Sequence, residues 1–278
     1  MPGAAAGPRL SDPRALAAHR ARAARIADDS AQFLHAAARD EVEEKLKDVN
    51  RTFTAPAVVT AHPGLWGDVA PEARVVPPDE VLDLSPGAQD LIVHAMCLHW
   101  ADDPVGQLIQ CARALRPDGL LIAALPGGET LHELRAALGQ AEIELCGGLS
   151  PRVVPTGELR DMAGLLQRAG LALPVADLSE MRVRYRDIAH LARDLRAMGE
   201  TSALAQRRRE VPPRGLFPLA DRIYRDAFPD GDGIAATFQT IYLTGWAPSA
   251  DQPRPLRPGS AQVSLADVLG RDDERGER

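Results

Sequence analysis

The sequence contains only three cysteines and has no excess of basic residues. Cys97, Cys111 and Cys146 are odd in number and widely spaced, so they match neither a disulfide framework nor a zinc-binding pattern. This cysteine usage is typical of a protein in a reducing cytoplasm. The 278 residues include 32 Lys and Arg against 39 Asp and Glu, whereas binding to a phosphate backbone requires a basic surface. We therefore predict that nucleic acid is not a partner.

Long hydrophobic runs are also lacking. No run approaches the roughly 20 apolar residues of a membrane span, and the N-terminus has no apolar core of the kind found in secretory signals. The segment ALAAHRARAARI (15–26) is rich in Ala and Arg, as transit peptides are, but Asp12, Asp28 and Asp29 beside it favour a native amphipathic helix. We predict a cytoplasmic protein that does not span a membrane.

The common catalytic signatures are missing as well. The sequence has no Ser-His-Asp spacing, no His/Cys metal set and no HExxH motif. Gly127–Gly128 lack the Lys-Ser/Thr pair that completes a phosphate-binding loop. Metal catalysis is the least supported chemistry, and we predict no metal site.

What the sequence does contain is an alternation of short apolar strands and amphipathic helices. The segments AVVTA (57–61), DLIVHA (90–95) and LLIAAL (120–125) have the composition of buried strands. Between the last two lies a helical stripe that begins at Asp103 and Pro104, an N-cap and first-turn pair. The order strand, helix, strand predicts a parallel βαβ sheet. Further helices are expected over 131–145, 159–169, 187–198 and 216–228, and a last strand over 236–246.

Several segments carry a resemblance to known families. DLIVHAMCLHW (90–100) followed by ALRPDGLLIAALPGGETLHELR (114–135) resembles the class I methyltransferases that use S-adenosylmethionine (SAM). GGLSPRVVPTGELRDMAGLLQRAGLALPVAD (147–177), DLRAMGETSAL (194–204) and FQTIYLTGWAP (238–248) are similar to the methyltransferase-like assembly factors of respiratory complex I. That family is close to the malonyl-carrier-protein methyltransferase of biotin synthesis. The resemblance runs from about Phe33 to Leu269.

The resemblance implies an α/β fold with a Rossmann-like sheet of seven strands, the last antiparallel, and a SAM pocket at the carboxyl ends of the strands. In the mitochondrial relatives it implies hydroxylation of an arginine on a complex I subunit. We expect an N-terminal helical arm (1–32) and a methyltransferase-like domain (33–250) with a helical insertion near 187–228. A Pro-rich and charged tail (251–278) follows.

The sequence departs from the family at the expected SAM loop. Where relatives show an acid and glycines after the first strand, this chain has apolar Val58–Val59 and then Thr60, and only Gly64 of the glycines is kept. Asp90 follows Gly64 by only 26 positions, whereas one βαβ unit takes roughly 30 residues or more. We predict that the sheet is shortened by one α/β unit and that SAM binding is weak or absent.

Four further residues are candidates for binding the cofactor. His62 in the first loop is placed to contact a ligand carboxylate, or it is an ordinary loop histidine. Asp79 and Glu80 align with the acidic segment that lies beside the adenine in relatives, or they are solvated charges. His94 ends a strand that points at the pocket rim, or it is a satisfied core residue. With Gly64, these residues make up the predicted cofactor site.

His99 and Trp100 follow the second apolar strand and are the candidates for a catalytic role, with Trp100 alternatively capping the core. Our first hypothesis is a protein with a degenerate SAM site that acts by binding a protein partner, a complex I subunit being one candidate. The partner-facing element is then the insertion, where apolar Phe217 lies near the arginine-rich loop 207–209. The alternative is an active SAM-dependent methyltransferase or a protein-arginine hydroxylase.

Overall fold

A computed structural model describes residues 9–252 of the chain. Contacts divide the chain into a unit of residues 1–248 and a second unit from Ser249 onward. All helices and strands below belong to the first unit. Most of the predicted tail (251–278), and residues 1–8 of the predicted arm, lie outside the described residues. Within residues 9–252, no helix combines the length and the apolar character that crossing a membrane requires.

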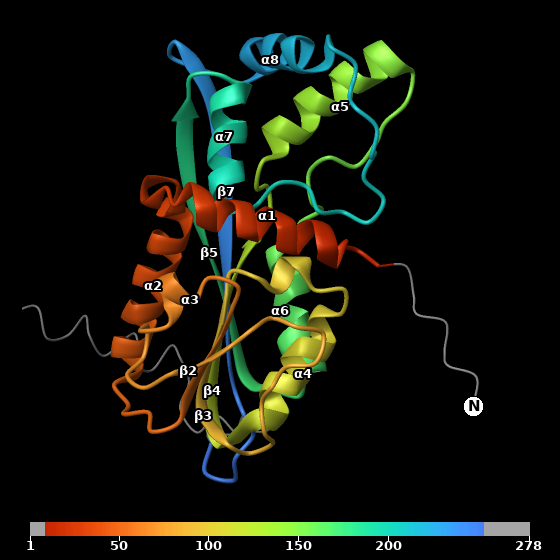
Figure 1. Cartoon of the computed structure of the whole chain (residues 1–278). Coiled ribbons are helices and arrows are strands. Elements are labelled where there is room, and N and C mark those ends of the chain that lie inside the picture. The colour runs from red at the N-terminus through yellow and green to blue at the C-terminus, as the bar shows by residue number, and fades with distance from the viewer. Residues whose placement is uncertain (1–8, 253–278) are drawn as a thin grey trace, which may run out of the picture. The chain divides into compact units, whose positions relative to one another are not determined.

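A mixed β-sheet forms the centre of the first unit (Figure 1). Its strand order is β2-β1-β3-β4-β7-β5, and the two-residue β6 pairs with β7. β1, β2, β3 and β4 are parallel, whereas β7 is antiparallel to both of its long neighbours. The predicted Rossmann-like α/β fold with an antiparallel last strand is confirmed. The bounds are β1 (Pro56–Thr60), β2 (Arg74–Val76), β3 (Gln89–Ala95), β4 (Leu115–Gly127), β5 (Ala172–Tyr185), β6 (Pro229–Asp230) and β7 (Gly233–Trp246).

The sheet is shortened between β1 and β3, as the residue count predicts. This stretch holds only the four-residue helix α3 (Pro63–Trp66) and the three-residue β2, which pairs with β1 alone and ends the sheet. A parallel crossover needs a helix long enough to return the chain along the sheet. The short stretch therefore accommodates one edge strand and no complete α/β unit.

Helices cover both faces of the sheet. On one face α4 and α6 pack against side chains such as Val59 and Ile92, and on the other α2 and α3 pack against Val58 and Leu91. Neighbouring residues of a strand point to opposite faces, which is why β1 and β3 are apolar throughout. The helices are α1 (Pro13–Ile26), α2 (Phe33–Val49), α4 (Pro104–Ala114), α5 (His132–Cys146), α6 (Leu159–Arg168), α7 (Ile188–Met198) and α8 (Leu216–Ala227), with short turns η1 (Asp29–Gln32) and η2 (Leu98–Trp100).

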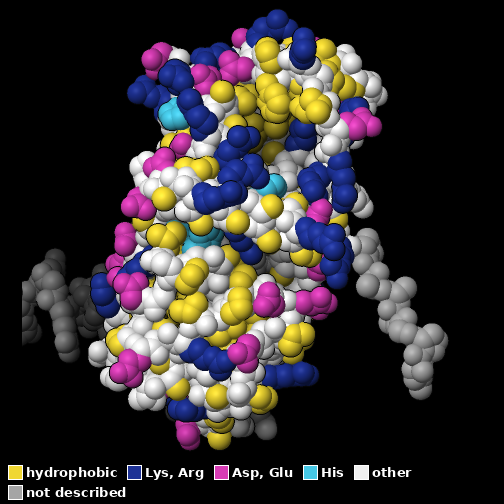
Figure 2. Space-filling view, viewed as in Figure 1, with side chains coloured by type: hydrophobic (Ala, Val, Ile, Leu, Met, Phe, Trp, Pro, Cys, Tyr) yellow, Lys and Arg dark blue, Asp and Glu magenta, His cyan; other side chains and the backbone are white. Residues whose placement is uncertain are grey.

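A separate helical layer lies beyond the carboxyl ends of the parallel strands. β5 and β7 are each 14 residues long, and β7 continues past Gly127, the last residue of β4. This extension presents Tyr185, Ile234 and Phe238 to α5, α7 and α8, which form their own buried cluster. α1 crosses between this layer and the lower part of the sheet (Figure 1). On the face in Figure 2, hydrophobic side chains gather at the end that carries α8, with Lys and Arg side chains beside them.

The predicted helix signals are present in the structure. Asp103 caps α4 by accepting a hydrogen bond from the backbone of Gly106 at 2.8 Å, an interaction worth about 1 kcal/mol. Gly199 follows α7 with φ +84°, a left-handed conformation that other residues rarely adopt. A Cβ at Gly199 would also lie 3.4 Å from the side chain of Ala23 on α1. Gly199 thus turns the chain where α1 packs closely on α7.

Candidate functional site

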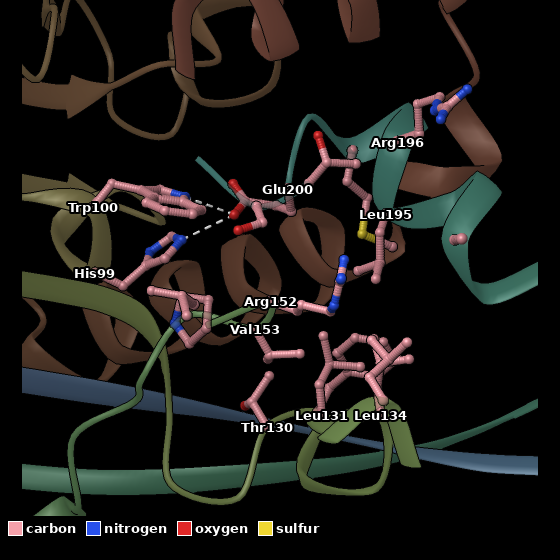
Figure 3. Close-up of a pocket in the computed structure, with 18 of the residues that line it drawn as sticks. His99, Trp100, Thr130, Leu131, Leu134, Arg152, Val153, Leu195, Arg196 and Glu200 are labelled. Atoms are coloured by element: carbon pink, nitrogen blue, oxygen red, sulfur yellow. Dashed lines mark hydrogen bonds and ion pairs between the residues drawn. The ribbon is translucent and has the colours of Figure 1, made fainter. Parts of the chain in front are cut away.

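A cavity of about 380 Å³ lies between the carboxyl edge of the sheet and the helical layer. Met96 and Pro126, near the ends of β3 and β4, contribute to its lining, and Phe238 of β7 contributes another part. Most of the remaining wall is apolar and comes from α5, α7, α8 and the segment before α6 (Figure 3). These apolar residues are Leu131, Leu134, Leu138, Val153, Val154, Leu195, Met198 and Phe217.

The polar end of the cavity is a three-residue group (Figure 3). His99 Nε2 lies 3.0 Å from Glu200 Oε2, and Trp100 Nε1 donates a hydrogen bond to the same oxygen at 2.8 Å. His99 and Trp100 belong to η2, directly after β3, whereas Glu200 is distant in sequence. The left-handed turn at Gly199 brings Glu200 back toward η2. All three side chains line the cavity.

Glu200 is ionised at neutral pH. Burial alone would raise its pKa, but the charge of His99, the hydrogen bonds from His99 and Trp100, and the nearby Arg20 lower the pKa to about 2. A carboxylate only accepts hydrogen bonds, so His99 Nε2 is the donor in this pair. The other ring nitrogen, Nδ1, is buried and has no partner among residues 9–252, and the same holds for Ser202 Oγ. Both residues line the cavity.

A buried ion pair fixes the segment that covers one side of the cavity. Glu142 on α5 accepts hydrogen bonds from Ser150 Oγ at 2.7 Å and from Arg152 Nη2 at 2.8 Å. Burial raises the pKa of Glu142, but these bonds outweigh it and lower the pKa to about 2. The pair holds Val153 against the cavity. The sequence does contain a signal for Glu142, because it follows Leu138 by four residues and so lies on the apolar face of the helix.

The candidate cofactor residues of the first loop lie elsewhere. His62 and Gly64 are at the start of α3, directly after β1, and neither lines the cavity. The His62 ring lies 4.4 Å from that of His35 on α2, and His35 Nδ1 accepts a hydrogen bond from Trp66 Nε1 at 2.9 Å. Burial lowers the pKa of both histidines, that of His35 to about 3. Gly64 is exposed, with open space where a Cβ would be.

Asp79 and Glu80 follow β2 and are exposed. Their backbone carbonyls accept hydrogen bonds from Gln107 and Gln110 of α4, each at 3.0 Å, which fixes the backbone and leaves the carboxylates outward. They are separated from the cavity lining, as are His62 and Gly64.

His94 lies inside the sheet. It is fully buried on β3, with Nε2 2.9 Å from Gln107 Oε1 and Nδ1 3.6 Å from Cys97 Sγ. Burial lowers its pKa to about 4, so the ring is neutral at pH 7. The structure thus groups His99 and Trp100 with Glu200, for which the sequence assigned no role, and places all five predicted cofactor residues outside the cavity lining.

The fold family implies SAM at the carboxyl ends of β1 and β2, and the residues there can be compared with what SAM needs. Its ammonium and ribose hydroxyls call for acceptor groups, of which carboxylates are the strongest. β1 ends in Val58, Val59 and Thr60, and the Thr60 hydroxyl is already bonded to the His62 backbone at 3.0 Å. Pro77–Pro78 follow β2. Neither strand end supplies a carboxylate, so this part of the site does not fit the cofactor.

The last question for this region is whether its side chains could hold a metal ion. Between residues 9 and 252, no group of three or more His, Cys, Asp or Glu side chains is placed to hold an ion.

Comparison with known proteins identifies the relatives of this chain. A sequence profile of the methyltransferase domain matches residues 67–123. The arginine-hydroxylase NDUFAF5, mitochondrial, of Danio rerio is 37% identical over 199 residues, which cover 71% of this chain and 62% of that protein. The Homo sapiens protein of the same name is also 37% identical, over 71% of this chain and 57% of its own length.

More distant matches follow. The malonyl-[acyl-carrier protein] O-methyltransferase of Xylella fastidiosa is 30% identical over 65% of this chain and 59% of that protein. A solved structure of loganic acid methyltransferase with SAH superposes with a TM-score of 0.45 at 15% identity, covering 76% of this chain and 79% of the other. The chain spans about three fifths of the length of the curated relatives it matches.

The chain thus combines a mixed α/β sheet whose last strand is antiparallel with a methyltransferase-domain match over residues 67–123. It is similar to the NDUFAF5 arginine-hydroxylases, and more distantly to the malonyl-[acyl-carrier protein] O-methyltransferases. The family resemblance noted in the sequence is thereby confirmed.

Proposed function

We propose that this chain acts mainly by binding a protein partner, as a complex I assembly factor does, and that its affinity for SAM is low or negligible. One observation carries the proposal: the strand ends where SAM would lie have no carboxylate, while the opposite half of the same edge holds a formed cavity. The relatives at 37% identity support a protein partner, and a complex I subunit is the first candidate.

The expected affinity follows from the missing contacts. A hydrogen bond to a charged group contributes about 1.5–3 kcal/mol, and each 1.4 kcal/mol corresponds to a tenfold change in affinity. A site without the acids that hold the ribose and the ammonium is therefore expected to bind SAM with a Kd on the order of 100 µM to millimolar, compared with the micromolar values of many enzyme sites.

Isothermal titration of the purified chain with SAM and with its demethylated product tests this part of the proposal. We expect no saturable heat in the low-micromolar range, and mass spectrometry of the purified protein should find no retained SAM. Low-micromolar binding, or SAM carried through purification, would overturn the degenerate-site proposal.

The second candidate is an enzyme, either a SAM-dependent methyltransferase or a protein-arginine hydroxylase. The group of His99, Trp100 and Glu200 favours it, because it places an imidazole beside a carboxylate in the cavity lining. Mass spectrometry of a complex I subunit incubated in air with the chain, SAM and a reductant decides between the two candidates. A mass gain of one methyl group or one oxygen atom on the subunit supports the enzyme, and an unmodified but captured subunit supports the binding function.

We also propose a cytoplasmic location, in contrast to the relatives that are named mitochondrial. The support is that Cys97, Cys111 and Cys146 are all free, two of them buried, as in proteins of a reducing compartment. Fractionation of cells that express a tagged full chain checks the location, and recovery in an organelle or membrane fraction would contradict it.

A further inference from the structure

A groove on the helical insertion adjoins the cavity. It lies between α7 and α8, and its lining shares Ala192, Arg196 and Phe217 with the cavity lining. Phe217 therefore borders both hollows, and its side chain remains 48% exposed. An aromatic ring at such a junction is a common anchor at protein interfaces, where a few aromatic and Arg residues carry most of the binding energy.

The floor of the groove is apolar and its rim is basic. Ile188, Ala192 and Phe217 supply apolar surface, while Arg193 and Arg196 lie three residues apart on α7. Across residues 9–252, neither of these arginine side chains takes part in a hydrogen bond or an ion pair. In Figure 3 the guanidinium of Arg196 points away from the polar end of the cavity.

The carboxylates of the groove are engaged within the fold. Asp187 accepts a hydrogen bond from a backbone N–H of its own helix at 2.7 Å and one from the Arg186 side chain at 3.0 Å. Asp221 accepts one from the Arg225 side chain at 2.9 Å and one from a backbone N–H at the start of α7 at 2.8 Å. Both carboxylates therefore form hydrogen bonds within α7 and α8. The charged groups that remain available to a partner are the guanidinium groups of Arg193 and Arg196.

This basic patch is opposite in sign to the chain as a whole, whose net charge is −7. Figure 2 shows dark blue side chains beside the hydrophobic ones at this end of the molecule. A basic patch on an acidic protein orients an incoming acidic partner and repels basic partners. The complementary partner surface is acidic.

We propose that the α7–α8 groove docks an acidic amphipathic segment of the partner protein, with one apolar side chain seated against Phe217. This inference rests on the proposed function, because it assumes a protein partner. Arg193 and Arg196 pair with carboxylates of the segment, and Ile188 and Ala192 contact its apolar face. The segment lies in the groove as amphipathic helices do in other proteins, at the border of the cavity that holds Glu200.

Selection from a random peptide library displayed on phage tests the chemistry of the segment without assuming its sequence. The full chain is the bait, and the double variant Arg193→Glu/Arg196→Glu is the counter-selection. We expect enriched peptides that combine Asp or Glu with apolar residues at helical spacing. Enrichment of neutral or basic peptides, or equal enrichment on the variant, would overturn the proposal.

Binding of the enriched synthetic peptides is then measured by fluorescence anisotropy on matched variants of the full chain. Arg193→Glu/Arg196→Glu and, separately, Phe217→Ala should each weaken binding by about tenfold or more. The control Arg160→Glu/Arg168→Glu makes the same change of net charge on exposed positions of α6, and should stay within about twofold of wild type. Equal losses in the control would show a non-specific charge effect and reject the groove.

Two further arms separate this inference from the proposed function. If wild type and Arg193→Glu/Arg196→Glu capture the same complex I subunit equally, the groove is wrong while partner binding stands. If no subunit is captured but acidic peptides still depend on Arg193 and Arg196, the groove stands and the named partner is wrong. Co-sedimentation with phosphatidylglycerol vesicles that is lost in the double variant would make the patch a membrane contact and overturn the peptide proposal.

Discussion

The carboxyl edge of the sheet has two halves that offer a ligand very different surroundings. In the half formed by β1 and β2, the strands have five and three residues, and a short helix follows, at whose start the His62 ring contacts that of His35. In the half formed by β4 and β7, the strands have 13 and 14 residues and border a cavity with a buried charged group. Along one edge of the sheet, the strands are short where a nucleotide cofactor would bind and long beside the helical layer.

The difference shows which elements build the cavity. The parallel strands supply only Met96 and Pro126 near their ends, whereas β7, the helices that it supports and the loops beside them supply most of the lining. The short β1–β2 half therefore does not affect the cavity, because no residue of β1 or β2 belongs to the cavity lining. A sheet that is shortened at one edge can in this way keep a cavity at its other half.

The largest expected effect tests whether the β1–β2 half is closed. Burial lowers the pKa of His35 from 6.5 to about 3, so the unfolded chain binds more protons below pH 6.5 and stability falls as the pH drops. Between pH 7 and pH 4 this costs about 3 kcal/mol of unfolding free energy. His35→Gln keeps an acceptor for Trp66 Nε1 and should lose that much less stability over this range, as measured by urea unfolding. Equal pH dependence of the two proteins would mean that this half is open to water.

The second prediction concerns the opposite half. Glu142→Gln leaves Arg152 without its charge partner, and breaking a buried pair costs about 3–5 kcal/mol. Because Arg152 is partly exposed, we expect about 2–3 kcal/mol here, together with a looser cavity wall at Val153. Below pH 4.5 the wild type should lose the same stability as the pH approaches the lowered pKa of Glu142.

The control for this prediction is Glu144→Gln on the same helix. Glu144 is exposed, so its substitution should leave the unfolding free energy within about 0.5 kcal/mol of wild type. A loss as large as that of Glu142→Gln would show that the helix as a whole is sensitive to charge and that the ion pair has no special role.

The sequence predicts most of the fold and only part of the site, for physical reasons. Apolar periodicity and capping residues such as Asp103 and Gly199 act locally, so the strands and helices that they mark are found in the structure. The spacing from Gly64 to Asp90 likewise limits what can fit between two strands. Glu200 escaped assignment because its partner His99 is 101 positions away, and no local pattern records a contact that only the turn at Gly199 creates. His94 and His99 look alike in sequence, yet one packs inside the sheet and the other lines the cavity.

The third prediction asks whether the cavity half supports chemistry. If the chain has a ligand-dependent activity, His99→Ala should lower it by about tenfold or more, because it removes the imidazole that pairs with Glu200 in the cavity lining. His132→Ala is the control, since His132 lies outside the cavity lining. Circular dichroism should show that both variants are folded. An equal loss from His132→Ala would show that the active region has been misplaced.

The smallest expected effect concerns the arginine-rich loop near the cavity mouth. From the sequence alone, charge reversal at Arg207–Arg209 is expected to lower partner capture without lowering Tm. The structure changes this expectation, because Arg207 Nη2 lies 3.0 Å from Asp12 Oδ2 and Arg209 also approaches that carboxylate. Asp12 is the N-cap of α1, so the contact ties the N-terminal helix to the loop beside the cavity.

Arg207→Glu should therefore lower Tm by about 2 °C, the scale of one partly screened ion pair in a chain of this size, as measured by differential scanning calorimetry. Arg208→Glu is the matched control, because Arg208 pairs with its neighbour Glu210 and both are exposed, so its Tm should equal that of wild type. If Arg207→Glu also leaves Tm unchanged, the contact with Asp12 contributes nothing to the anchoring of α1. Loss of partner capture in that variant would then report charge at the interface alone, because the packing of α1 would be unchanged.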